Sequence, residues 1–174
     1  MGSVTNLQNQ HEEGDINIVA LWLKKDPTRW TAGALGGFTA GLIALVVAMV
    51  LSTMGGYEFL LPTKFPAIPF LGAEATTLGM HLNAILLGLA VQSVLSIFLG
   101  VIYAHFTSTN NFKALLGAGF TWGIFSWIFI FNLFIQSFPA VHAMEISRGG
   151  ALFICLAYGF SLVTVGTFDR MLRK

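Results

Sequence analysis

Four side chains that could ligate a metal ion or a haem are expected on the same side of the predicted helices: His81, His142, Glu145 and Glu74. Imidazole and carboxylate groups together can bind a divalent metal, and two histidine nitrogens can ligate haem iron. His81 and His142 are therefore candidate cofactor ligands. Their spacing matches no established motif, and the simpler interpretation is that both hydrogen-bond to backbone or water at an interface. His105 is expected at the opposite surface and cannot join them.

The long apolar stretches of the chain contain no acid or base other than histidine. Ion-coupled carriers usually place such a group near the middle of the membrane, so a pump is disfavoured. The sequence also lacks Gly-x-Ser-x-Gly, His-Glu-x-x-His and a phosphate-binding glycine loop. We therefore expect a protein that is not an enzyme and has no resident cofactor.

The elements that would position these side chains are four apolar helices. Only 10% of the 174 residues are charged and 55% are hydrophobic, whereas soluble domains carry about 25% charge. Crossing a ~30 Å hydrocarbon core takes about 20 helical residues. The charge-free stretches predict spans at residues 32–53, 78–106, 114–136 and 149–168. The predicted fold class is all-α, an integral membrane four-helix bundle made of two helical hairpins.

Basic residues indicate how these spans are oriented. An inside N-terminus leaves only Lys64 and Arg148 outside, so both termini are predicted to be cytoplasmic. Residues 1–14 are expected to be a disordered tail, residues 15–29 an amphipathic interfacial helix ended by Pro27, and residues 30–174 the transmembrane domain. Lys24, Lys25 and Arg29 are expected near anionic lipid headgroups. No basic run predicts a nucleic-acid partner.

Two connecting segments carry further information. Residues 55–75 contain three prolines among apolar side chains, so we expect this segment to pack over the helix ends or lie in the outer interface. The segment 105–113 is short and polar, which is typical of a turn. Spans two and three are therefore predicted to be neighbours.

Small residues predict how the helices associate, because helices in lipid gain little from hiding leucine and must pack closely. Gln92 lies mid-span and needs a hydrogen-bond partner, for which Thr121, Ser126 and Asn132 of span three are candidates. The similar stretches 37–41 and 119–123 suggest a parallel internal repeat. The predicted packing residues are Gly33, Gly37, Gly41, Gly88, Gln92, Gly100, Gly119 and Gly123.

Through short sequence motifs in its spans, the chain resembles small four-helix bacterial inner-membrane proteins of the YagU-like kind, many of which have no assigned activity. The resemblance rests on Gly37-Phe38-Thr39-Ala40-Gly41, Leu99-Gly100-Val101-Ile102-Tyr103-Ala104 and Leu156-Ala157-Tyr158-Gly159. It implies a multi-pass protein of the bacterial inner membrane. In similar proteins a histidine often precedes the last of these motifs, but Cys155 occupies that position in this chain.

Three functional hypotheses remain open at this point. The first is a non-catalytic accessory or scaffold subunit that docks on other integral membrane subunits, or on itself, through aromatic and glycine-rich faces. The second is an oligomeric channel or facilitator for a small neutral solute, lined by Asn83, Gln92, Ser96 and Thr121. The third is a haem- or metal-binding membrane subunit that uses His81 and His142.

Overall fold

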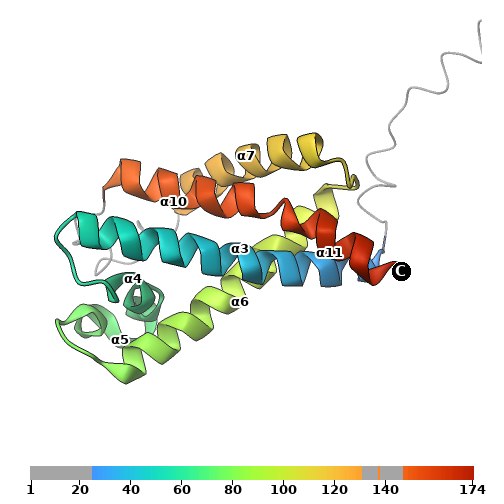
Figure 1. Cartoon of the computed structure of the whole chain (residues 1–174). Coiled ribbons are helices and arrows are strands. Elements are labelled where there is room, and N and C mark those ends of the chain that lie inside the picture. The colour runs from blue at the N-terminus through green and yellow to red at the C-terminus, as the bar shows by residue number, and fades with distance from the viewer. Residues whose placement is uncertain (1–24, 131–136, 138–146) are drawn as a thin grey trace, which may run out of the picture.

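The computed structural model describes residues 25–130, 137 and 147–174. Within these residues, four helical segments are long and apolar enough to cross a membrane. They are α3 (Pro27–Met54), α6 (Leu82–Phe106), α7 (Phe112–Phe129) and a bent fourth segment made of α10 (Arg148–Ser161) and α11 (Thr164–Leu172) (Figure 1). The predicted fold class, an all-α membrane bundle, is confirmed.

Polar caps fix where three of these helices begin. The side chains of Asp26, Asn111 and Ser147 accept hydrogen bonds from the backbone of the first turn of α3, α7 and α10. This satisfies amides that have no partner within the helix. Pro27 opens α3, so residues 27–29, expected in the interfacial helix, form the first turn of the first span. The tail 1–14 and residues 15–24 of that helix lie outside the described residues.

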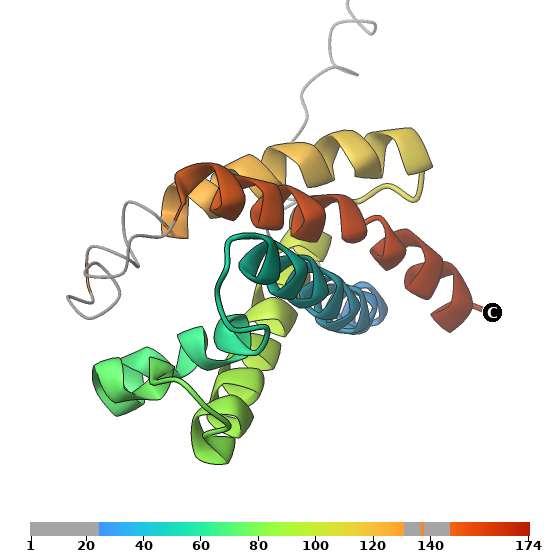
Figure 2. The ribbon, with the colours of Figure 1, turned by 60° about the vertical axis from the view of Figure 1, so that its left-hand side comes forward.

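The helices form a row rather than a closed square. α3 packs against α6 on one side and against α10 and α11 on the other, and α7 packs against α10. Figure 2 looks roughly along α3, with α7 and α10 on one side of it and α6 on the other. α6 and α7 meet beside their connecting loop, where the Tyr103 hydroxyl donates to the Leu115 carbonyl over 2.8 Å. The two helices then diverge (Figures 1 and 2), so their predicted proximity holds only at that end.

Glycines bring α3 and α6 to backbone distance. A Cβ added at Gly33 would lie 2.7 Å from the Gly100 carbonyl oxygen, and one at Gly37 would lie 2.8 Å from the Gly100 Cα. Both distances are shorter than van der Waals contact between the atoms concerned. Gly41 occupies the next turn and faces the Ser96 side chain. No larger residue fits at this crossing unless the helices separate.

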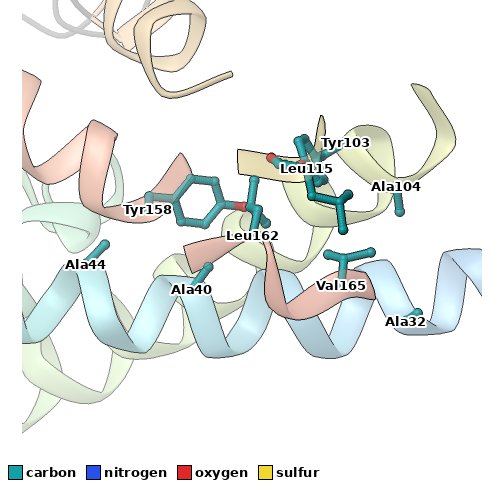
Figure 3. Packing of buried hydrophobic residues seen from close by; sticks show 9 residues of the cluster. All are labelled: Ala32, Ala40, Ala44, Tyr103, Ala104, Leu115, Tyr158, Leu162 and Val165. Atoms are coloured by element: carbon teal, nitrogen blue, oxygen red, sulfur yellow. Dashed lines mark hydrogen bonds between the residues drawn. The ribbon is translucent and has the colours of Figure 1, made fainter. Parts of the chain in front are cut away.

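The other side of α3 packs against the bent fourth span through alanines. Figure 3 shows Ala32, Ala40 and Ala44 along α3, with side chains of α10 and α11 above them. A Cβ added at Gly36 would meet Val165 of α11, 3.1 Å from its Cα. The residues of this core are Ala32, Ala40, Ala44, Tyr103, Ala104, Leu115, Tyr158, Leu162 and Val165. α3 packs against α6, its partner in the first hairpin, and also against α10 and α11 of the second part of the chain. The two hairpins therefore form one packed unit.

The α7–α10 hairpin is closed by the same kind of contact. A Cβ at Gly123 would lie 2.8 Å from the Cys155 carbonyl oxygen, and one at Gly119 would lie 3.0 Å from the Gly159 carbonyl carbon. Gly119 and Gly123 are the residues that the proposed repeat aligns with Gly37 and Gly41. Each hairpin therefore uses glycines of its first helix to approach its second helix. The internal repeat itself stays a prediction.

Close contact at Gly37 predicts that adding one methyl group will destabilise the protein. Gly37→Ala should cost about 1–3 kcal/mol, because α3 and α6 must separate to admit the new Cβ. Gly117→Ala is the matched control, since its Cβ would have nothing within 4 Å and alanine favours a helix by roughly 0.5–1 kcal/mol. Thermal unfolding in detergent measures both. Equal melting temperatures for the two variants would contradict the crossing described above.

Candidate functional site

The most polar part of the described protein is an ion-pair cluster at the end where residues 25 and 174 both lie. The Arg29 guanidinium in the first turn of α3 is 3.3 Å from the Asp169 carboxylate in α11, and these side chains are only 7% and 3% exposed. Charged groups are rarely buried unless they are paired and hydrogen-bonded. The buried pair therefore joins the start of the first span to the end of the last.

Arg29 also holds the loop between α6 and α7. Its Nε and Nη2 donate to the Thr107 carbonyl over 3.1 and 2.6 Å, and Nη2 donates to the Thr109 carbonyl over 2.9 Å. Its Nη1 donates to the Asn110 side chain, whose amide nitrogen donates to Asp169 over 2.7 Å. The Arg29 guanidinium thus connects α3, which carries it, to the α6–α7 loop and to α11. Several donors in a fixed planar arrangement suit it to this role.

Arg173 completes the cluster from the C-terminal side. Its Nε donates to the Asp169 carboxylate over 3.0 Å and its Nη2 pairs with the Asp26 carboxylate, the N-cap of α3. The hydrogen bonds that it donates, first to Asp26 and then to Asp169, raise the pKa of the Arg173 guanidinium. With two guanidinium groups and two carboxylates, the cluster is balanced in charge. Every carboxylate in it accepts from an arginine, so none is left as a free base.

A bend in the fourth span brings Asp169 to this place. α10 ends at Ser161 and α11 begins at Thr164. The Ser161 hydroxyl donates to the Ala157 carbonyl over 2.7 Å, and the Thr164 hydroxyl donates to the Ser161 carbonyl over 2.8 Å. Such side-chain bonds to the helix backbone accompany bends. After the bend, α11 lies along the first half of α3 and places Asp169 beside Arg29.

A recess of about 240 Å³ opens beside the cluster. Trp30 donates from its indole nitrogen to His105 Nδ1 over 3.3 Å across it. The recess lies at the helix ends, where tryptophan commonly marks a membrane interface. Its lining residues are Asp26, Arg29, Trp30, Ala104, His105, Ser108, Asn110, Asp169 and Arg173.

A second ion pair stabilises the segment between α3 and α6. Lys64 is completely buried, and its Nζ donates to the Glu58 carboxylate over 2.8 Å and to the Thr77 and Gly79 carbonyls over 3.2 and 2.6 Å. One ammonium group thus ties the start of the segment to its end. Gly79, at φ 106°, adopts a backbone conformation that favours glycine.

This segment packs between the ends of α3 and α6 that lie away from residues 25 and 174, as one of the two sequence expectations proposed (Figure 1). Its helical turns are α4 (Leu61–Lys64), η2 (Phe65–Ala67), α5 (Ile68–Leu71) and η3 (Gly72–Thr76). Ala67 and Ile68 form a small core with Ala84 of α6. Gly88 lets the Thr63 carbonyl approach α6.

The candidate cofactor ligands remain separate from these clusters. His81 is exposed just before α6, and its Nε2 is 3.2 Å from the Leu78 carbonyl oxygen. A contact between His81 and the backbone is what the simpler of the two sequence interpretations predicts. His142 lies outside the described residues, as does Glu145. Among the residues that are described, no three of His, Cys, Asp and Glu come together as a metal site would require.

Gln92 lies on the predicted packing face of α6 but has a different partner. Its amide nitrogen donates to Ser96 of the same helix over 3.4 Å. Thr121 instead donates to the Gly117 carbonyl, and the buried Ser126 hydroxyl has no hydrogen-bond partner within the described part of the chain. The expected bonds from Gln92 to these two residues are wrong, because α6 and α7 have diverged at this depth. Asn132, the third expected partner, lies outside the described residues.

The sequence alone does not predict the Arg29–Asp169 pair. It predicts lipid headgroups as the partners of Arg29, whereas the residue is 6% exposed and bonded within the protein. That prediction is wrong because the bend in the fourth span directs a carboxylate to Arg29. The sequence does contain one indication of the pair. Arg29 lies just before the predicted first span, and Asp169, of opposite charge, directly follows the predicted last span on the same side.

No family model, curated protein or solved structure matches this chain. Its function must therefore be inferred from its own contacts. The length and apolar composition of four helical segments among the described residues are those of a multi-pass membrane protein.

Neutralising Asp169 should destabilise the bundle, because Arg29 would keep its buried charge and lose its closest counterion. We expect Asp169→Asn to cost about 3–5 kcal/mol, the usual effect of breaking a buried pair. Arg170→Gln is the control on the same helix, since Arg170 is exposed. Thermal melting in detergent compares the two variants. An Asp169→Asn protein that melts with the wild type would show that the pair does not hold the helix ends together.

Removing the Glu58 charge should loosen residues 58–79 without unfolding the four spans. Glu58→Gln leaves the buried Lys64 ammonium with a neutral partner, at a cost of about 1.5–3 kcal/mol. Hydrogen exchange in this segment should accelerate roughly tenfold or more. Glu74→Gln changes an exposed carboxylate nearby and should leave exchange unchanged. Unaltered exchange in Glu58→Gln would contradict the role of Lys64.

Proposed function

We propose that this protein is a non-catalytic accessory or scaffold subunit that docks on another integral membrane protein. The observation that carries the proposal is the outer face of α7. This helix lies at the end of the row and packs against α10 through Gly119, Gly123 and Ser126. Among the described helices, none lies beside the opposite face of α7 in Figures 1 and 2.

The outer face of α7 carries small residues that the protein's own packing does not require. Gly117 is exposed, and a Cβ there would have nothing within 4 Å. Thr121 follows one turn later and is also exposed. Glycine inside a helix costs roughly 0.5–1 kcal/mol relative to alanine, and a lipid-facing position gains nothing from it. Small residues four apart are the usual contact of one membrane helix with another.

Aromatic and branched side chains border this shallow face. Phe120, Phe125 and Ile128 are 45%, 54% and 47% exposed. Large side chains beside a small-residue patch give a shape into which a partner helix can pack. The exposed face is therefore suited to a transmembrane helix of another subunit, which would reach the α7 backbone at Gly117.

The charges support a cytoplasmic location for both termini. Among the described residues, the end where residues 25 and 174 lie has Lys25, Arg29, Lys113, Arg170, Arg173 and Lys174 against Asp26 and Asp169. The other end has Lys64 and Arg148 against Glu58 and Glu74, and Lys64 is paired with Glu58. From the positive-inside tendency we propose that both termini are cytoplasmic, and we propose a bacterial inner membrane as the location.

The other two hypotheses have less support in the described part of the chain. Ser96 is buried where α3 and α6 cross, whereas Thr121 lies on the outer face of α7 and Asn83 is exposed at the start of α6. These residues do not line one route within a single copy. His81 has a backbone contact and no second ligand beside it among the described residues. We therefore favour the accessory subunit.

The docking proposal predicts that Gly117→Leu separates the protein from its partner and leaves its fold intact. Wild-type protein purified from its native membrane in mild detergent should carry a second integral membrane protein, visible by mass. Gly117→Leu should reduce that association tenfold or more, because the side chain fills the patch. Ala90→Leu, at an exposed small residue of α6, should keep the partner.

Two results would overturn the docking proposal. One is a monomeric, partner-free particle in several mild detergents. The other is full retention of the partner by Gly117→Leu. A particle with twice the mass of the chain would assign the face to a second copy in place of a different subunit.

A further inference from the structure

The recess beside the ion-pair cluster has unused hydrogen-bond donors. Trp30 donates to His105 Nδ1, so the neutral imidazole must carry its proton on Nε2. Among the described residues, neither that Nε2, nor the Ser108 hydroxyl, nor Nη1 of Arg173 has a hydrogen-bond partner. His105, Ser108 and Arg173 all line the recess. We propose that the recess binds the phosphoryl group of an anionic phospholipid.

The carboxylates in the recess do not oppose an anion. Asp169 already accepts from Arg29, Arg173 and Asn110, and Asp26 pairs with Arg173. The charges of the two aspartates and the two arginines cancel. The hydrogen-bonding groups of the lining that remain unused are donors. A phosphoryl group offers several strong acceptor oxygens and no obligatory donor. A metal cation would find no carboxylate in the recess that is free of an arginine.

The position of the recess favours a lipid over a dissolved phosphate. Trp30 is partly buried in the first turn of α3, and Phe106, next to His105, is 54% exposed. The recess thus lies where polar headgroups meet acyl chains. At this end of the described chain six basic residues oppose two acidic ones, which attracts anionic lipids.

The size of the recess fits a headgroup better than a whole molecule. Its volume of about 240 Å³ is below the range of roughly 300–1,000 Å³ that is usual for small-molecule pockets. A phosphoryl group with its glycerol carbons can enter, while the acyl chains stay in the bilayer beside the exposed side of α6. Binding at this place joins the lipid to the same segments that the ion-pair cluster connects.

Native mass spectrometry of the full-length protein in detergent tests this inference. The probes are phosphatidylglycerol, diacylglycerol with the same acyl chains and no phosphoryl group, and inorganic phosphate. We expect phosphatidylglycerol alone to bind. Ser108→Ala should weaken it about tenfold, the size of one hydrogen bond to a charged group. Adding His105→Phe, which keeps an aromatic ring, should weaken it further. Thr76→Val removes a hydroxyl at the opposite end and should leave binding unchanged.

Three results would overturn the inference. Equal binding of phosphatidylglycerol by the wild type and by both recess variants would place the lipid elsewhere. Equal binding of diacylglycerol would show that the phosphoryl group is not recognised. Inorganic phosphate bound as tightly as the lipid would assign the recess to a soluble ligand. Ser108 is exposed, so Ser108→Ala keeps the test decisive even if His105→Phe does not fold.

Discussion

Backbone-distance contact along α3 is the interaction on which the rest of the structure depends. In a bilayer the lipid tails are as apolar as the side chains, so helices associate through close packing. α3 meets this requirement twice, with Gly33 and Gly37 against α6 and with Gly36 and Ala40 toward the bent fourth span. Were α3 spaced from either neighbour by larger side chains, the two hairpins would not share a core. Arg29 would then not reach Asp169.

Ionic groups close the two ends of this packed unit. Lys64 connects parts of one chain segment at the end away from residues 25 and 174, while Arg29 connects α3, the α6–α7 loop and α11 at the opposite end. In both places a buried cation is surrounded by a carboxylate and by backbone carbonyls. This arrangement offsets the cost of removing a charge from water. The clusters therefore specify which segments meet, and the outer face of α7 is left without a described helix against it.

The sequence predicts the elements of this fold better than their arrangement. Charge-free stretches locate the spans because the bilayer excludes charge, and glycine spacing indicates the packing faces because only glycine admits a neighbouring backbone. The order of the helices depends on which face meets which, and no local pattern carries that information. Gly36 illustrates this, because its neighbour Val165 lies far along the chain. The sequence predicts lipid contact for Arg29 for the same reason, since its partner Asp169 reaches it only through the bend after Ser161.

The measurement that most directly tests the central position of α3 is disulfide formation in native membranes. With Cys155, the single cysteine, replaced by serine, Gly36→Cys is combined with Val165→Cys or with Gly117→Cys. A Cβ at Gly36 would lie 3.1 Å from the Val165 Cα. The two helices must therefore separate by a few tenths of an ångström to admit the cysteine, which leaves the two sulfur atoms within bonding reach. The account predicts rapid cross-linking of residues 36 and 165 and none of residues 36 and 117. Cross-linking to residue 117, or its absence at residue 165, would contradict it.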